Sequence, residues 1–151
     1  MGRIIRWRDT QMFPGGAFIW SRLLRAGDQA NEREHAKGNI KGDIFGCPDS
    51  LSIGPGDLLW IQTNVHSSQL NQGEFKRFLT GPNMREITGV LFTPDGTTLF
   101  NIVQHPGESP TDRGDPKYPD QYSSWPDHID DNHPRSATVA IRKINYGVIG
   151  G

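Results

Sequence analysis

Cysteine, net charge and long apolar runs are all scarce in this sequence. Cys47 is the only cysteine, so the chain cannot form an internal disulfide. Its 151 residues must be held by a buried core, which a chain of this length can supply. No run approaches the ~20 apolar residues of a membrane-spanning helix, and the N-terminus lacks an apolar signal core. We therefore expect a soluble protein with no membrane partner, and a reducing cytoplasm is its default compartment.

The charge balance limits the kinds of partner. A net charge of −1 argues against wholesale coating of nucleic acid. The charge is uneven, however, because residues 1–42 carry eight basic and four acidic side chains while residues 105–133 carry two basic and seven acidic ones. A basic face could contact a few phosphates, or the two ends could simply attract each other. The sequence has no Gly-x-Gly-x-x-Gly motif and no Gly-Lys-Ser/Thr loop, so nucleotide hydrolysis is unsupported and no cofactor is expected.

Glycine and proline, in contrast, are plentiful and mark the turns. The chain has 18 glycines and 11 prolines, which is typical of short strands separated by many turns. The Pro-Gly turn at 55–56 predicts a strand at 57–63. The Pro-Asp-Gly turn at 94–96 predicts a hairpin between strands at 86–93 and 97–103. Residues 136–146 alternate apolar and polar side chains, which indicates a half-buried closing strand.

The other segments are less regular. We expect a strand at 2–7, a buried strand or short helix at 17–24, and a helix at 67–79, where the apolar residues fall imperfectly on one helical face. Residues 105–135 form a long loop rich in proline, aspartate and tyrosine. The predicted fold class is α+β, a small β-barrel of about six strands with one or two short helices. It forms a single domain over 1–151, with an N-terminal extension at 1–16; a sheet sandwich is the alternative.

The order of several short motifs resembles the PUA-like barrels of the EVE and YTH group. The Phe-Gly-Cys-Pro stretch at 45–48 is similar to the family's Trp-Gly-x-Pro element. The Pro-Gly-Asp stretch at 55–57 and the Ile-x-Gly-Val stretch at 87–90 are similar to its turn and one of its strands. Two features depart from the family: phenylalanine replaces tryptophan at Phe45, and the segments at 27–42 and 105–135 are unusually elaborated.

The resemblance implies a non-catalytic module that binds a nucleic acid or nucleotide and recognises a modified base in an aromatic pocket. Stacking on an aromatic ring suits any base and is worth ~1–3 kcal/mol by alanine substitution. On this basis the ligand-binding candidates are Trp20, Phe45 and Trp60 as pocket walls, Gly46 beside them, and Ser21, Thr63 and Asn64 at the base edge. The phosphate-binding candidates are Arg22, Arg25, Lys37 and Lys41.

Each of these residues also has a purely structural interpretation, and two other functions stay open. The aromatic side chains suit a core, and the basic ones suit a solvated surface. A β-rich chain with long loops and oppositely charged ends would suit a structural or assembly protein, such as a shell or tube subunit. A small metal-dependent enzyme could use the loop from His128 to His133, since imidazole and carboxylate suit zinc or iron, although a solvated acidic loop explains the same residues. The oligomeric state is open.

Overall fold

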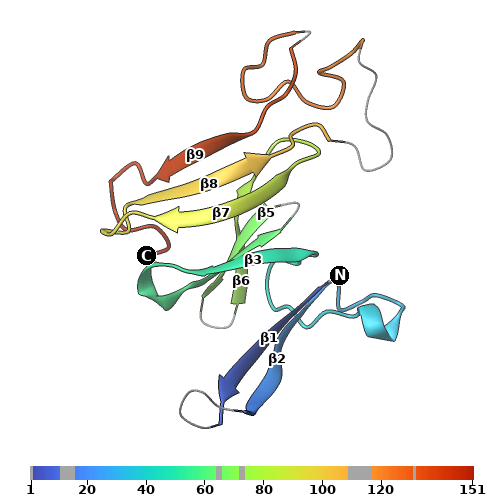
Figure 1. The fold of residues 1–151 in the computed structure, drawn as a ribbon, viewed down its shortest axis with the longest axis vertical. Helices are drawn as coiled ribbons and strands as arrows, with labels where there is room; N and C mark the ends of the chain where they lie inside the picture. Colours follow the sequence, from blue (N-terminus) through green and yellow to red (C-terminus); the bar gives the residue numbers. More distant parts are fainter. Residues whose placement is uncertain (1, 11–15, 64–65, 72–73, 109–116, 131) are drawn as a thin grey trace.

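The structure is a stack of three β-sheets. The computed structural model describes residues 2–10, 16–63, 66–71, 74–108, 117–130 and 132–151. The strands within these residues are β1 (Gly2–Asp9), β2 (Phe18–Ala26), β3 (Pro48–Ile53), β4 (Leu59–Thr63), β5 (His66–Asn71), β6 (Glu74–Thr80), β7 (Glu86–Phe92), β8 (Thr98–Gln104) and β9 (Ala137–Arg142). They form an antiparallel β1–β2 hairpin, a sheet in the order β3–β4–β5–β6, and a sheet in the order β7–β8–β9. Figure 1 shows the four-stranded sheet between the other two.

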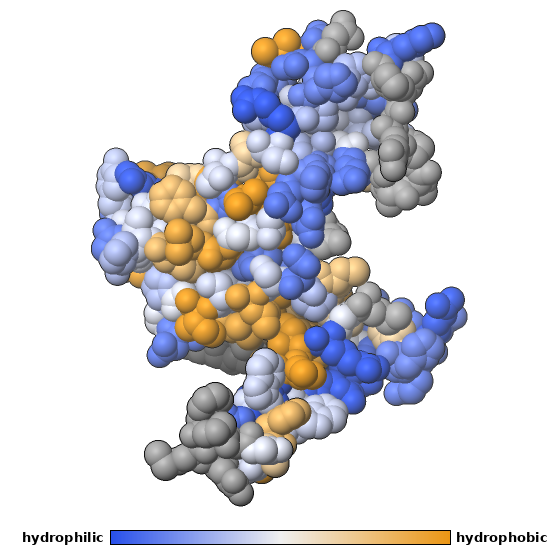
Figure 2. All heavy atoms as spheres, in the orientation of Figure 1, coloured by the Kyte–Doolittle hydropathy of each residue, from blue (hydrophilic) through white to orange (hydrophobic). Residues whose placement is uncertain are grey.

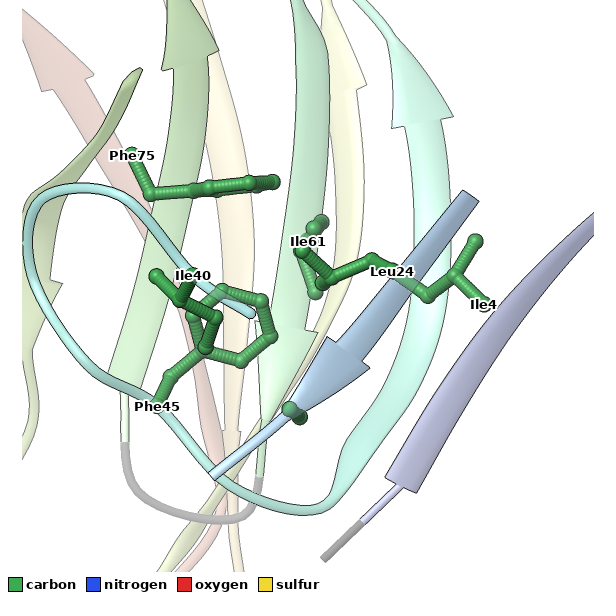
Figure 3. Close-up of a cluster of buried hydrophobic side chains, with 7 residues drawn as sticks. Ile4, Leu24, Ile40, Phe45, Ile61 and Phe75 are labelled. Atoms are coloured by element: carbon green, nitrogen blue, oxygen red, sulfur yellow. The ribbon is translucent and has the colours of Figure 1, made fainter. Parts of the chain in front are cut away.

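Strand β4 explains why the four-stranded sheet lies in the middle. Successive side chains of a strand point to opposite faces, and β4 is buried on both of them. Ile61 packs on one face with Ile4 and Leu24 of the hairpin, in a cluster that Figure 3 shows in close-up. Trp60 points to the other face, where it packs with Leu99 of β8. A strand that is buried on both faces has a continuous run of apolar residues, and residues 58–61 form such a run.

The predicted hairpin at 86–103 is confirmed. Strands β7 and β8 are antiparallel partners, and Thr93 and Thr98 close the turn between them with a 2.9 Å backbone hydrogen bond. The Asp95 carboxylate accepts hydrogen bonds from the Thr93 and Thr97 hydroxyls, at 2.6 and 3.1 Å. Gly96 has a φ of 67°, which glycine adopts without strain. The closing strand is confirmed too, since β9 pairs with β8 in antiparallel register.

The prediction of a barrel with a helix at 67–79 is wrong. Those residues form β5 and β6, which pair with each other so that Leu70 lies opposite Phe75 in register. Pairing of β5 with β4 prevails over the imperfect helical periodicity, because a short helix has little stability without an apolar face to bury. The only helical elements among the described residues are the 3-10 turns η1 (Glu34–Ala36) and η2 (Pro55–Asp57). The described strands form no closed barrel, since each of the three sheets has its own edges.

Several large apolar side chains lie on the outer surfaces of the stack. Ile5 on β1, Ile53 on β3 and Leu91 on β7 are all exposed. Hydrophobic surface is visible across the sheets in Figure 2, between hydrophilic surfaces at the segment around η1 and at the connection between β8 and β9. None of the described helices is long and apolar enough to cross a membrane.

Candidate functional site

Charged and polar residues gather where β7 begins and β8 ends. Glu86, the first residue of β7, lies opposite Gln104, the last residue of β8. Arg85 directly precedes the first strand and His105 directly follows the second. Because the two strands are antiparallel partners, these four residues share one end of the three-stranded sheet. We call this region the polar sheet end; it comprises Arg85, Glu86, Gln104, His105, Glu108 and Ser136.

Backbone hydrogen bonds hold the two loops of the polar sheet end together. The amide of Gly107 donates to the carbonyl of Asn83 at 3.1 Å, and the amide of Glu108 donates to the carbonyl of Met84 at 3.1 Å. Met84 and His105 both have left-handed backbones, with φ of 48° and 47°. That conformation is uncommon for residues other than glycine and is kept where the surrounding structure imposes it. The two loops therefore have a fixed, mildly strained geometry.

The polar sheet end has groups that can bind an anion and move a proton. Burial lowers the pKa of Arg85 from its ordinary value, but a guanidinium stays charged at any physiological pH. The Nδ1 atom of His105 lies 3.9 Å from the Glu108 carboxylate, and both side chains are exposed. The His105 amide donates to the Ser136 hydroxyl at 3.2 Å, which ties the end of β8 to the start of β9.

The loop that follows this region is braced by an ion pair. The Arg135 guanidinium donates two hydrogen bonds to the Asp127 carboxylate, at 2.7 and 2.8 Å. These bonds hold the pKa of Asp127 below its usual value and raise the pKa of Arg135. In the described part of the chain, no group of three or more His, Cys, Asp or Glu residues is placed to hold a metal ion, and the alternative of a metal-binding loop at 128–133 stays a prediction. Asp131, one of its candidates, lies outside the described residues.

The three predicted aromatic walls do not share a pocket. Trp60 is 0% exposed and packs edge-on against Phe78, with ring centroids 4.8 Å apart. Phe45 is 2% exposed and packs against Phe75 in the separate cluster on the opposite face of β4. Trp20 is 60% exposed on the hairpin and belongs to neither core cluster. The expectation of an aromatic pocket is therefore wrong, because two of its three rings are core residues that pack on opposite faces of β4.

The polar candidates of that pocket are equally dispersed. Ser21 lies beside Trp20 in a hollow of about 480 Å³ on the hairpin, and its hydroxyl accepts a 3.3 Å hydrogen bond from Arg6. Thr63 is fully buried at the end of β4, and Gly46 is half-buried after Phe45. Asn64 lies outside the described residues.

Two of the four basic candidates line the same hollow, and the other two lie elsewhere. Arg25 and Lys37 line one hollow of about 370 Å³, together with Arg3 and His35. Arg22 lies farther along β2, opposite Ile5, and is not among the residues that line it. Lys41 is exposed in the segment that reaches β6, where its carbonyl accepts the amide of Phe75 at 2.7 Å. Sequence reasoning missed Arg3 and His35.

The fold is layered and almost entirely β, and charged residues gather at the polar sheet end. The family model of the alkaline phosphatase PhoX matches residues 1–107, which is more than half of the sequence. The chain therefore belongs to the PhoX family. It is also similar to the solved structure of Pseudomonas fluorescens PhoX in complex with vanadate, a transition-state analogue, with 28% identity and a TM-score of 0.76. No curated protein sequence matches the chain significantly.

The family match overturns the main functional expectations. The resemblance to PUA-like barrels of the EVE and YTH group is wrong, and so is the nucleic-acid-binding, base-recognising module that it implied. The expectation of a non-catalytic protein is contradicted as well, since the matching family is one of phosphatases. Among the alternatives, the small metal-dependent enzyme fits the match better than the shell or tube subunit does. The alignment covers 99% of this chain but only 27% of the P. fluorescens protein, so the chain spans about a quarter of that protein's length.

Proposed function

We propose that this chain takes part in the hydrolysis of phosphate esters, as a phosphatase of the PhoX kind. The observation that carries the proposal is the alignment of 99% of the chain with a PhoX structure that holds vanadate, a transition-state analogue. The polar sheet end supports it, because arginine, histidine and carboxylate side chains suit phosphoryl transfer. An arginine stabilises the charge that spreads over the phosphoryl oxygens, and a histidine transfers a proton to or from the reacting oxygen.

The residues of the polar sheet end would have distinct roles. The Arg85 guanidinium would contact the phosphoryl oxygens, and partial burial makes that contact stronger than it would be in bulk water. His105 would exchange the proton, and the Glu108 carboxylate, 3.9 Å from the Nδ1 atom, would orient the imidazole. The fixed geometry of the two loops would hold these groups in place before a substrate arrives.

Vanadate binding and ester hydrolysis by the 151-residue chain test this proposal. We expect the chain to bind vanadate in calorimetry and to hydrolyse p-nitrophenyl phosphate at alkaline pH, with vanadate as an inhibitor. Arg85→Gln should lower kcat/KM by about 10²–10³-fold, as removal of one charge-stabilising donor does. His105→Asn should lower it by at least about 10²-fold, and asparagine tolerates the left-handed backbone at this position.

The matched control is Arg142→Gln. Arg142 lies at the opposite end of the same sheet, where its Nε donates to the Thr98 hydroxyl at 2.8 Å. This variant should keep its activity within a few-fold of the parent chain. The proposal fails if the parent chain neither binds vanadate nor hydrolyses the ester, or if Arg142→Gln loses as much activity as Arg85→Gln.

A further inference from the structure

We propose that the hollow at the base of the β1–β2 hairpin binds a phosphate group, as inorganic phosphate or as part of a phosphate monoester. The hollow has a volume of about 370 Å³. Its lining consists of Arg3, Arg25, His35 and Lys37 with the small residues Gly2 and Ala26. We call it the cationic hollow. This inference goes beyond hydrolysis at the polar sheet end and does not depend on it.

The fold brings together basic residues that are far apart in the sequence. Antiparallel pairing of β1 and β2 places Arg3 directly opposite Arg25. The segment after η1 is then held against β2 by backbone atoms: the Arg25 amide donates to the Asn39 side-chain oxygen at 2.6 Å, and the Asn39 amide donates to the Arg25 carbonyl at 3.0 Å. These bonds bring Lys37 beside the arginine pair. They use the main chain of Arg25, which leaves its guanidinium available to a ligand.

The cationic hollow carries more positive charge than its surroundings neutralise. Like charges directly opposite each other on a two-stranded ribbon are destabilising. Among the residues that the structure describes, no carboxylate lies within ion-pair distance of Arg3 or Arg25, and neither guanidinium makes a hydrogen bond. Lys37 has a partner, since its ammonium lies 2.8 Å from the Glu34 carboxylate. A bound anion would offset the repulsion between the two arginines. Anion binding would therefore explain why the fold places two arginines opposite each other.

Phosphate is the anion that fits this set of groups. Guanidinium groups pair with phosphate oxygens through two parallel N–H···O bonds, and a lysine ammonium adds a point charge. The doubly charged form of phosphate suits the two arginines, whose charges no carboxylate in the described residues offsets, better than a single carboxylate does. A volume of about 370 Å³ is within the range of small-molecule sites, which leaves room for an organic group on the phosphate.

The cationic hollow is separate from the polar sheet end. The hairpin and the β7–β9 sheet lie on opposite sides of the four-stranded sheet in Figure 1. The hollow contains no carboxylate among its lining residues to activate a water molecule. Its role is therefore capture of a phosphate group at a distance from the polar sheet end, rather than hydrolysis.

Nuclear magnetic resonance of the ¹⁵N-labelled 151-residue chain tests the proposal, because it locates the bound ion. The chain, in a buffer free of phosphate, is titrated with inorganic phosphate and, in a second arm, with glycerol 3-phosphate. Sodium chloride at matched ionic strength corrects for screening. We expect saturable shifts of the amides of residues 2–3, 25–26 and 35–37. Tighter binding of glycerol 3-phosphate would identify esters as the preferred ligand, and equal binding would identify free phosphate.

Two variants and one control complete the experiment. Arg3→Gln and Arg25→Gln should each weaken phosphate binding at the hollow at least tenfold while the remaining amide spectrum stays that of the folded chain. Arg22→Gln removes a positive charge from the same hairpin but outside the hollow, and it should change the affinity less than twofold. The proposal is overturned if chloride causes the same shifts, or if all three variants weaken binding equally. Shifts at residues 84–86 and 104–108 report the polar sheet end instead, so loss of one set without the other distinguishes the two proposals.

Discussion

Replacement of Trp60 by alanine tests whether this residue belongs to the core or to a ligand pocket. The indole is 0% exposed, and its ring lies 4.8 Å from that of Phe78 and 5.3 Å from that of Phe92. Removing a large buried aromatic typically costs about 3–5 kcal/mol, because apolar contacts are lost and a cavity remains. Each aromatic pair adds about 0.5–1.5 kcal/mol beyond the buried area. We therefore expect Trp60→Ala to lower the free energy of unfolding by about 4 kcal/mol or more.

Two further substitutions serve as controls for this prediction. Trp60→Phe keeps an aromatic ring and removes an indole N–H that has no hydrogen-bond partner among the described residues, so it should cost less than half as much. Trp20→Ala removes an indole that is 60% exposed and lies opposite Trp7 on the hairpin. Its loss should be about 0.2–1 kcal/mol, the usual contribution of a cross-strand pair.

Urea unfolding followed by far-ultraviolet circular dichroism measures all three variants on one scale. Fluorescence is unsuitable because the substitutions change the tryptophan content. The transition midpoint should fall while the slope stays constant, since the same surface is exposed on unfolding. A loss below about 1 kcal/mol for Trp60→Ala, or an equal loss for Trp20→Ala, would refute the assignment of Trp60 to the core between the two sheets.

Two more predictions concern packing and pH. Gly54→Ala should destabilise the chain by about 1–3 kcal/mol in the same urea assay, because its Cβ would lie 2.4 Å from the Trp60 Nε1 atom; Gly46→Ala, with no atom within 4 Å of its Cβ, should be nearly neutral. The Asp127 pKa is lowered by Arg135, so its contribution to stability is present above the unfolded pKa of about 3.9 and is lost as the pH falls through the lower folded value. Thermal unfolding from about pH 6 to about pH 2 should therefore show a smaller acid-induced decline for Asp127→Asn than for the parent chain, and identical declines would contradict this.

Local turn chemistry made part of the fold predictable. The turn at 94–96 fixed the β7–β8 hairpin, because proline, aspartate and glycine each favour the backbone angles that such a turn needs. The pattern at 136–146 likewise indicated β9. The same logic failed for β5 and β6, since pairing with β4 involves residues distant in sequence, which periodicity does not report. Turn motifs also recur in unrelated β proteins. The Pro-Gly-Asp stretch at 55–57 therefore does not indicate how the sheets stack, and the resemblance to PUA-like barrels, which relied on it, was wrong.

The residues of the two candidate sites were only partly predictable from the sequence. Counting outward from the turn, where Phe92 lies opposite Leu99, would place residue 86 opposite residue 105. The irregularity between Thr88 and Leu91 shifts the register by one, so that Glu86 lies opposite Gln104. The sequence could therefore locate the polar sheet end only to within one residue. The local excess of basic residues drew attention to Arg25 and Lys37, and the structure places both in the lining of one hollow. It could not supply Arg3, whose place depends on the β1–β2 register and its irregularity between Ile4 and Ile5.

Because β4 is buried on both faces, the cationic hollow and the polar sheet end depend on different packing contacts. Ile61 supports the hairpin side of the stack, on which the cationic hollow lies, whereas Trp60 supports the β7–β9 sheet. Local stability follows local packing, so loosening one face does not require opening the other. A mild core variant such as Trp60→Phe should therefore disturb vanadate binding at the polar sheet end more than phosphate binding at the hollow. Substitutions in the two sites should act additively, because the sites lie on opposite sides of the four-stranded sheet (Figure 1).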